Sequence, residues 1–281
     1  MGNEIDYIDG EKFEGLADVS FGDAYTNEKN IDLRKAIEDV DVDIPLVYCS
    51  IDSIDEGFEK IRGYGKMVDL ISHNGDTNLT HIDVANKPQN VRFWFSQNMM
   101  HLDEHTCPLP IGMERKFWSK KIYGIAGYKN DCISKSQDVH CDKDQLLYVN
   151  FHIRTNRAKR QRSFDIFKNT RYSVIDLGDK TRDYDNYIGN IKRSKFVLSP
   201  EGHGMDCHRT WETLYAGSIP VIERNLYYEN LYSDLPVLLV DDFSVIDEKL
   251  LHSEYERINN TKWNMDKMGF HYWEDMILGR K

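Results

Sequence analysis

The sequence predicts an α/β protein with two domains, each built around a parallel β-sheet. Its 281 residues are more than one domain usually needs and are enough for two. Short apolar runs alternate with helical patterns in both halves, and this alternation is typical of parallel sheets. Glycine-containing turns follow two of the apolar runs, at 73–76 and 199–204. In open α/β sheets, ligands bind where such turns leave the carboxyl ends of strands.

The first half begins with an acidic, weakly patterned stretch of about 45 residues that contains one expected helix. Three apolar runs rich in β-branched and aromatic residues then predict strands, and a helical pattern separates the first two. The expected helices cover 32–40 and 55–63, and the expected strands cover 46–51, 67–72 and 91–96.

The second half follows a polar stretch, 119–145, whose weak periodicity suggests an interdomain connection. We therefore expect one domain over 1–143 and another over 144–261, with an aromatic-rich tail, 262–281, packed on the body of the protein. The expected strands are 146–151, 172–178, 196–198, 219–222 and 237–240, and a helix is expected over 247–259.

The most informative stretch is 194–223, which predicts a strand, a glycine turn, a helix and a second strand. We expect the helix to begin after an N-cap at Asp206 and to end near Gly217.

This turn carries residues suited to an anionic ligand. Gly202 and Gly204 allow backbone N–H groups to approach a ligand closely, and a helix N-terminus favours anions. Arg209 lies in the first helical turn, where the helix dipole disfavours a cation unless a phosphate binds. Glu212, one turn later, has a carboxylate that can accept hydrogen bonds from sugar hydroxyls. The alternative is an ordinary β-turn-α connection with a surface arginine.

The run SKFVLSPEGHGMDCHRTWETLYAGSIPVI resembles the C-terminal half-site of the exostosin-like glycosyltransferases. It is most similar to the small exostosin-like xylosyltransferases encoded by chlorella viruses. Glu212 with AGSIPVI at 216–222 also resembles a motif of many two-Rossmann-domain (GT-B) glycosyltransferases, in which the glutamate binds the nucleotide ribose. Weaker matches are HNGD at 73–76, LPIGMER at 109–115 and VNFHIRTNRAKR at 149–160.

This resemblance implies two Rossmann-like domains that face each other across a cleft, with the last helix crossing back to the first domain. The first domain, with the tail, would bind a glycan acceptor, and the second would bind the nucleotide sugar. The implied reaction is an inverting transfer of xylose from UDP-xylose to a glycan hydroxyl, with no metal or other cofactor. A viral enzyme of this kind would work in the host cytoplasm.

An inverting transfer needs a base to take the proton of the acceptor hydroxyl. Asp76, at the end of a predicted strand, is our first candidate, with His73 and Glu114 as alternatives. The competing interpretation of Asn-Gly-Asp at 74–76 is simple turn chemistry.

Other side chains are candidates for holding the donor. A cationic cluster at 155–162 follows a predicted strand, and from it we choose Arg157 and Arg162 for the diphosphate. A solvated helix start would explain these cations equally well. Glu201 or His203 would touch the donor sugar, and Tyr184 would stack on uracil unless it belongs to the core.

Composition excludes some classes of protein. A net charge of −11 argues against a general nucleic-acid surface. No apolar run approaches the ~20 residues that span a bilayer, and the acidic N-terminus does not resemble a signal peptide. Five cysteines, an odd number at irregular spacing, favour free thiols in a reducing compartment. We therefore expect a cytoplasmic protein.

Two rival functions and one rival metal site are compatible with parts of the sequence. A nucleotide-sugar-binding protein without catalysis would share the glycine turn. A zinc peptidase is suggested by His-x-x-Glu-His at 101–105, although a proline-containing stretch follows at once. The Asp-x-Asp triplets at 39–43 precede a predicted strand, where acidic residues are usually solvated, so we expect no metal there.

Overall fold

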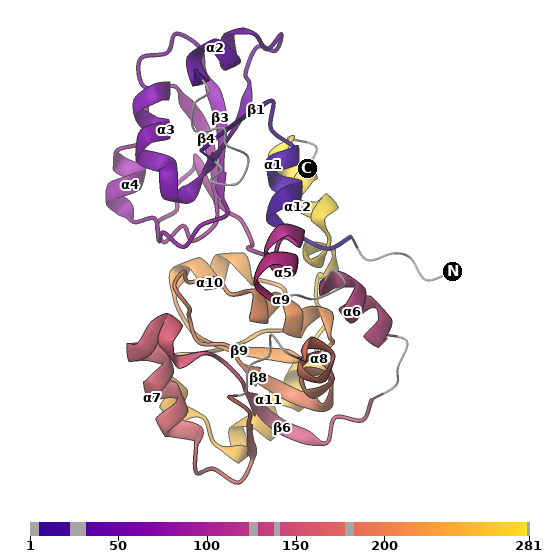
Figure 1. Ribbon diagram of the computed structural model, residues 1–281. Helices are drawn as coiled ribbons and strands as arrows, with labels where there is room; N and C mark the ends of the chain where they lie inside the picture. Colours follow the sequence, from indigo (N-terminus) through magenta and orange to yellow (C-terminus); the bar gives the residue numbers. More distant parts are fainter. Residues whose placement is uncertain (1–5, 23–31, 124–128, 138–140, 178–182, 280–281) are drawn as a thin grey trace. The chain divides into compact units, whose positions relative to one another are not determined.

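The computed structural model describes residues 6–22, 32–123, 129–137, 141–177 and 183–279, and divides into two compact units (Figure 1). The N-terminal unit comprises Ile8–Ile111 and Phe270–Lys281, and the C-terminal unit comprises Met1–Tyr7 and Gly112–Gly269. Each unit contains one five-stranded parallel sheet with helices packed on it. The predicted fold class, α/β with two Rossmann-like domains, is therefore confirmed.

The borders of the units differ from the expected domain borders. The chain enters the C-terminal unit at Gly112 instead of residue 144, because the polar stretch expected to be a linker forms two helices of that unit. These are α5 (Lys116–Tyr123) and α6 (Lys129–Gln137), and α6 packs on α8 (Tyr184–Arg193). The tail divides as well, since only Phe270–Lys281 groups with the N-terminal unit.

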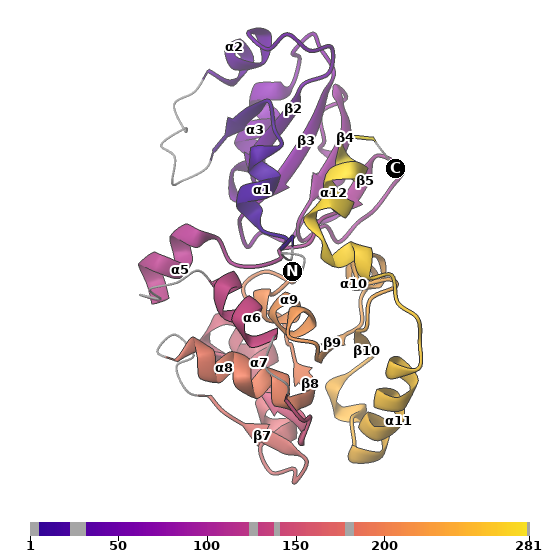
Figure 2. The ribbon, with the colours of Figure 1, turned by 90° about the vertical axis from the view of Figure 1, so that its right-hand side faces the viewer.

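The sheet of the N-terminal unit has its strands in chain order, β1-β2-β3-β4-β5. Parallel strands are joined by right-handed crossovers, so a sheet wound in one direction keeps its connecting helices on one face. Figures 1 and 2 show α3 and α4 on one face of this sheet and α1 and α12 on the other. On the second face, the rings of Phe13 in α1 and Phe270 in α12 pack together with their centroids 5.2 Å apart. The strands are Val19–Phe21, Leu46–Ser50, Val68–His73, Val91–Ser96 and Thr106–Pro108; the helices are α1 (Gly10–Gly15), α2 (Leu33–Glu38), α3 (Ile54–Ile61), α4 (His81–Ala85) and α12 (Phe270–Ile277).

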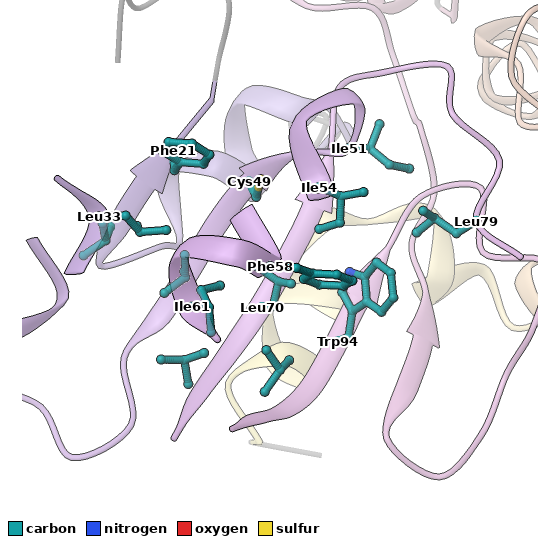
Figure 3. Close-up of a cluster of buried hydrophobic side chains, with 14 of the residues drawn as sticks. Phe21, Leu33, Cys49, Ile51, Ile54, Phe58, Ile61, Leu70, Leu79 and Trp94 are labelled. Atoms are coloured by element: carbon teal, nitrogen blue, oxygen red, sulfur yellow. The ribbon is translucent and has the colours of Figure 1, made fainter. Parts of the chain in front are cut away.

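The core of this unit lies between the sheet and α3 (Figure 3). Phe58 of α3 packs edge-on against Trp94 of β4, with ring centroids 5.0 Å apart. The indole N–H of Trp94 donates to the Ser72 hydroxyl at 2.8 Å, so the large ring is buried without an unpaired donor.

The sheet of the C-terminal unit has the order β10-β9-β8-β6-β7, in which the direction of winding reverses between β6 and β8. Helices consequently cover both faces. Phe167 of α7 and Leu251 of α11 pack with Leu147 on one face, whereas Tyr187 of α8 meets Tyr148 on the other. The strands are β6 (Gln145–Val149), β7 (Ser173–Ile175), β8 (Ser194–Leu198), β9 (Ile219–Glu223) and β10 (Leu238–Val240); the further helices are α7 (Arg157–Phe167), α9 (His208–Tyr215), α10 (Leu226–Leu231) and α11 (Glu248–Asn259).

This reversal has a consequence for ligand binding. In doubly wound sheets the loops after the two strands at the reversal diverge, and ligands bind outside their carboxyl ends. The expected position in this unit is therefore beside Phe151, which follows β6, and the turn 199–207, which follows β8. Among the described strands of the N-terminal unit, which follow chain order, there is no such reversal. In the described part of the chain, no helix has both the length and the hydropathy needed to cross a membrane.

Candidate functional site

The turn between β8 and α9 is held in place by its own hydrogen bonds. Ser199 donates its N–H to Val221 O at 2.9 Å, and its hydroxyl lies 2.9 Å from that of Thr210. Gly202 donates to Gly204 O at 3.1 Å, and its own carbonyl accepts from the Asn156 amide at 3.0 Å. A Cβ at Gly202 would lie 3.0 Å from an Arg160 nitrogen, so a side chain at this position would crowd the Arg160 guanidinium.

Arg160 links the ends of β6 and β8. Its buried guanidinium donates to the carbonyls of Glu201 at 2.8 Å, Pro200 at 3.3 Å and His152 at 3.0 Å, and to the Thr155 hydroxyl. Burial, followed by the positive charge of Arg209, lowers the pKa of Arg160 to about 10. The surroundings of Arg160 therefore disfavour further positive charge and favour an anion.

Arg209 is the second residue of α9 and is only 4% exposed. Within the described part of the chain, its Nε and Nη1 atoms are buried and have no hydrogen-bond partner. Its guanidinium lies 5.8 Å from the Phe151 ring centroid, the same distance as that of Arg160. Buried donors without acceptors cost free energy, and a second cation adds to that cost. The site therefore presents unsatisfied donors and positive charge to an anionic ligand.

The start of α9 adds backbone donors to this arrangement. Cys207 is the N-cap residue, and its side chain makes no capping hydrogen bond. The predicted N-cap, Asp206, is wrong, because Asp206 lies one residue too early and turns inward. Its carboxylate accepts from the Trp211 indole at 3.0 Å and from the Tyr232 hydroxyl. The first N–H groups of α9 thus keep the polarity that suits a phosphate.

Glu212 lies one turn further along α9, and its side chain is fully buried. Its oxygens accept from the hydroxyls of Tyr184 at 3.1 Å and Tyr187 at 2.8 Å, and one lies 3.3 Å from Lys129 Nζ. Lys129 is also 2.6 Å from Glu114. Glu114, which we assigned to the acceptor-binding domain, therefore belongs to the C-terminal unit and connects to Glu212 through one ammonium group.

The remaining candidates for the donor differ in position. Arg162 is exposed and forms ion pairs with Glu223 and Asp242, which engages its guanidinium away from the turn. Arg157 is exposed at the start of α7, and His203 is exposed in the turn. Glu201 pairs with Lys159 at 2.5 Å, and the buried Tyr184 directs its hydroxyl to Glu212.

The buried cation in this cluster is Arg160, which we did not select. Asn156 is the N-cap of α7, and the buried positions of that helix are Arg160, Ser163 and Phe167, spaced three and four apart. Two of these three buried positions carry polar side chains, so the spacing of apolar residues in the sequence did not distinguish Arg160 from Arg157 and Arg162. Lys129 had no signal in the sequence either, because most residues of α6 are polar.

The loop after β3 in the N-terminal unit is firmly held. His73 is buried; its Nε2 donates to Pro110 O at 2.9 Å, and its Nδ1 lies 3.1 Å from the Asn74 side-chain oxygen. Asn74 adopts a positive φ of 59°, and its backbone N–H donates to the side-chain carbonyl oxygen of Gln97 at 3.2 Å. Asp76 is exposed, and its N–H donates to Asp52 at 3.2 Å. Of the two side chains, that of Asp76 is accessible to solvent and that of His73 is not.

The His-x-x-Glu-His stretch does not form a helix. Residues 101–103 are irregular, 104–105 form a turn, and β5 begins at Thr106. A zinc site of this type needs both histidines on one helix face, so the structure contradicts the peptidase alternative. Within the described ranges, no group of three or more His, Cys, Asp or Glu side chains is placed to hold a metal ion.

Residues 155–239 match the family model described as the RXYLT1 C-terminal domain. This range contains α7, the turn after β8, and α9, and it includes the stretch that carries the resemblance to exostosin-like glycosyltransferases. The resemblance is confirmed for this part of the chain. A viral origin stays a prediction. No protein with a curated description is significantly similar to the chain in sequence.

Several solved structures are similar to the chain. They include apo OtsA (9% identity, 88% of this chain and 75% of that one, TM-score 0.49). The α,α-trehalose 6-phosphate synthase of Burkholderia multivorans gives 7% identity over 88% and 72% of the two chains, with a TM-score of 0.43. CalG4, the calicheamicin glycosyltransferase, gives 10% over 91% and 81%, with a TM-score of 0.36. Because all three TM-scores are below 0.5, the fold assignment rests on the sheet topology.

Proposed function

We propose that this protein is a glycosyltransferase whose C-terminal unit binds the diphosphate of a nucleotide-sugar donor at the N-terminus of α9. The observation that carries the proposal is Arg209, a buried guanidinium with unpaired donors at the point where the sheet reverses its winding. A diphosphate would supply acceptors to Arg209 and to the uncapped N–H groups of α9, and it would face the positive charge of Arg160. The match of residues 155–239 to the RXYLT1 C-terminal domain supports sugar transfer as the reaction.

The finer assignments are part of the same proposal. The donor is UDP-xylose, the acceptor is a glycan hydroxyl, and the transfer inverts the anomeric carbon without a metal or other cofactor. Arg209 and the helix end stabilise the departing diphosphate as its negative charge grows, which is electrostatic catalysis. Glu212 binds the ribose, Glu201 or His203 meets the sugar, and Arg157, Gly202 and Gly204 line the diphosphate. We leave Arg162 out, because two carboxylates already engage it.

Asp76 is the proposed general base. Its side chain is exposed on a loop fixed by hydrogen bonds, whereas the His73 ring is buried with a partner near each nitrogen. A base must be reachable by the acceptor hydroxyl, and this favours Asp76.

The central experiment replaces Arg209 by methionine and measures UDP binding by calorimetry together with thermal stability. Removing a buried, unpaired cation should leave the melting temperature unchanged or raise it, while UDP affinity falls by roughly 30-fold or more because charged hydrogen bonds are lost. Arg162→Met is the matched control and should bind UDP like the wild-type protein.

A second control is Arg160→Met, which should lower the melting temperature because four acceptors lose their donor. Wild-type UDP affinity in Arg209→Met would overturn the proposed site. Binding of UDP without hydrolysis or transfer of any UDP-sugar would favour a nucleotide-sugar-binding protein instead.

A further inference from the structure

A buried cluster of charged side chains in the C-terminal unit includes Glu212, a residue of the proposed donor site, and links α6, α8 and α9. Lys129, at the start of α6, is 2% exposed. Its Nζ lies 2.6 Å from a Glu114 oxygen and 3.3 Å from a Glu212 oxygen, and 5.1 Å from the Tyr184 ring centroid. One ammonium group is therefore shared by two carboxylates whose side chains are 10% and 0% exposed.

The Lys129 ammonium places a positive charge against the Glu212 carboxylate, and the hydroxyls of Tyr184 and Tyr187 donate hydrogen bonds to it. Burial, and next the charge of Glu212, raise the pKa of both tyrosines well above its usual value, so both hydroxyls keep their protons. A fully buried carboxylate stays ionised only when a cation and hydrogen bonds offset its loss of hydration.

We infer that Lys129 is a positioning residue for donor binding: it holds Glu212 in place as an anion, and Glu114 in turn holds Lys129. This inference rests on the proposed function, because Glu212 is the proposed ribose contact. It also gives Glu114 a role different from that of a base, since its carboxylate is nearly buried against an ammonium and is not presented to an acceptor hydroxyl.

The test compares the pH dependence of UDP affinity in Lys129→Met, Lys129→Arg and wild-type protein from about pH 9 to about pH 6. Among the described residues, the groups near Glu212 and its two tyrosines that carry or can take up charge include Lys129, Glu114, Tyr148, Tyr184, Tyr187, Cys132 and Arg209. Without Lys129, two buried carboxylates lack their ammonium, and Glu212 should take up a proton as the pH falls.

In Lys129→Met, UDP affinity should therefore fall by about tenfold relative to wild type at the lower pH and recover toward the higher pH. Glu212→Gln imitates the protonated carboxyl, so its affinity should be low at every pH and equal to the low-pH limit of Lys129→Met. Lys129→Arg should follow the wild-type profile. Lys135→Met, an exposed position on the same helix with the same change of charge, is the matched control.

The outcomes separate this inference from the proposed function. If Arg209→Met loses UDP but Lys129→Met and Glu212→Gln keep wild-type profiles, the positioning role is wrong and the donor site stands. If Arg209→Met also binds normally, the donor site itself fails.

Glu114→Gln gives a second measurement that does not require Lys129→Met to fold. A positioning Glu114 predicts that Glu114→Gln transfers sugar within about tenfold of the wild-type rate, whereas loss of a general base costs about 10²–10⁴-fold. A loss of the larger size, with UDP affinity unchanged, would overturn the assignment.

Discussion

Two arginines with similar burial show how differently one residue type can be used at this site. Arg160 directs its donors to carbonyls of the turn, so its contribution is to the shape of the loop. Arg209 has two buried nitrogens that no group in the described chain accepts from. The sequence predicted Arg209 because a cation in the first turn of a helix opposes the helix dipole. It could not predict the burial of Lys129, which depends on how α6 packs.

Asp206 offers a test of stability at the scale of one residue. Asp206→Ala would leave the Trp211 indole and the Tyr232 hydroxyl without their acceptor in a buried position. We expect the free energy of unfolding to fall by about 3 kcal/mol, since each stranded buried donor costs about 1–3 kcal/mol. Urea unfolding measures this change.

The control for Asp206 is Asp183→Ala, which removes an exposed N-cap of α8 and should cost only about 1 kcal/mol. Equal losses in the two variants would mean that the carboxylate of Asp206 does not satisfy the buried donors.

At the scale of elements, α9 holds more than the proposed ligand residues. The chain crosses from one unit to the other at three points: after Tyr7, before Gly112 and after Gly269. Near each of these points, α9 contacts a residue that belongs to the C-terminal unit. His208 Nδ1 lies 2.8 Å from Gly112 O, the Tyr215 hydroxyl donates to Met268 O at 2.8 Å, and Tyr7 packs edge-on against Tyr215 at 4.8 Å. One eight-residue helix thus combines residues of the proposed anion site with these three contacts.

Tyr215→Phe tests the contribution of one such contact. The variant keeps the ring and removes only the hydroxyl that donates to Met268 O. The expected loss in free energy of unfolding is about 1 kcal/mol, measured by urea denaturation. Tyr255→Phe is the control, because the Tyr255 hydroxyl makes no hydrogen bond within the described part of the chain and should contribute little. A loss in Tyr255→Phe as large as that in Tyr215→Phe would contradict this account.

Elements with a strong hydrophobic pattern were predictable from the sequence, and polar ones were not. The strands expected at 46–51, 67–72 and 91–96 match β2, β3 and β4 to within one residue, because buried parallel strands are continuous apolar runs. The helix α6 was missed, since its residues show almost no apolar face. β1 has only three residues and lies in a stretch whose acidic composition conceals it.

At the scale of the whole molecule, the proposed roles fall on different units. The donor residues Arg209 and Glu212 belong to the C-terminal unit, and Asp76 belongs to the N-terminal unit. The topology supports this proposal for the donor, since of the two sheets formed by the described strands only that of the C-terminal unit reverses its winding. Sequence periodicity predicted both sheets but not the order of their strands, because strand order depends on which crossovers pack together.

Asp76→Asn therefore separates catalysis from donor recognition. The substitution keeps the size of the side chain and removes its ability to take a proton, so the rate of transfer from UDP-xylose to a glycan acceptor should fall by about 10²–10⁴-fold. UDP affinity, measured by calorimetry, should stay within about twofold of wild type, since Asp76 lies outside the unit that is proposed to bind UDP. The control is Asp55→Asn, which removes the same charge from an exposed position in the first turn of α3. This variant should alter neither the transfer rate nor the UDP affinity. A wild-type transfer rate in Asp76→Asn would mean that another group accepts the proton, and a joint loss of UDP affinity and transfer would mean that Asp76 supports the donor instead of the acceptor.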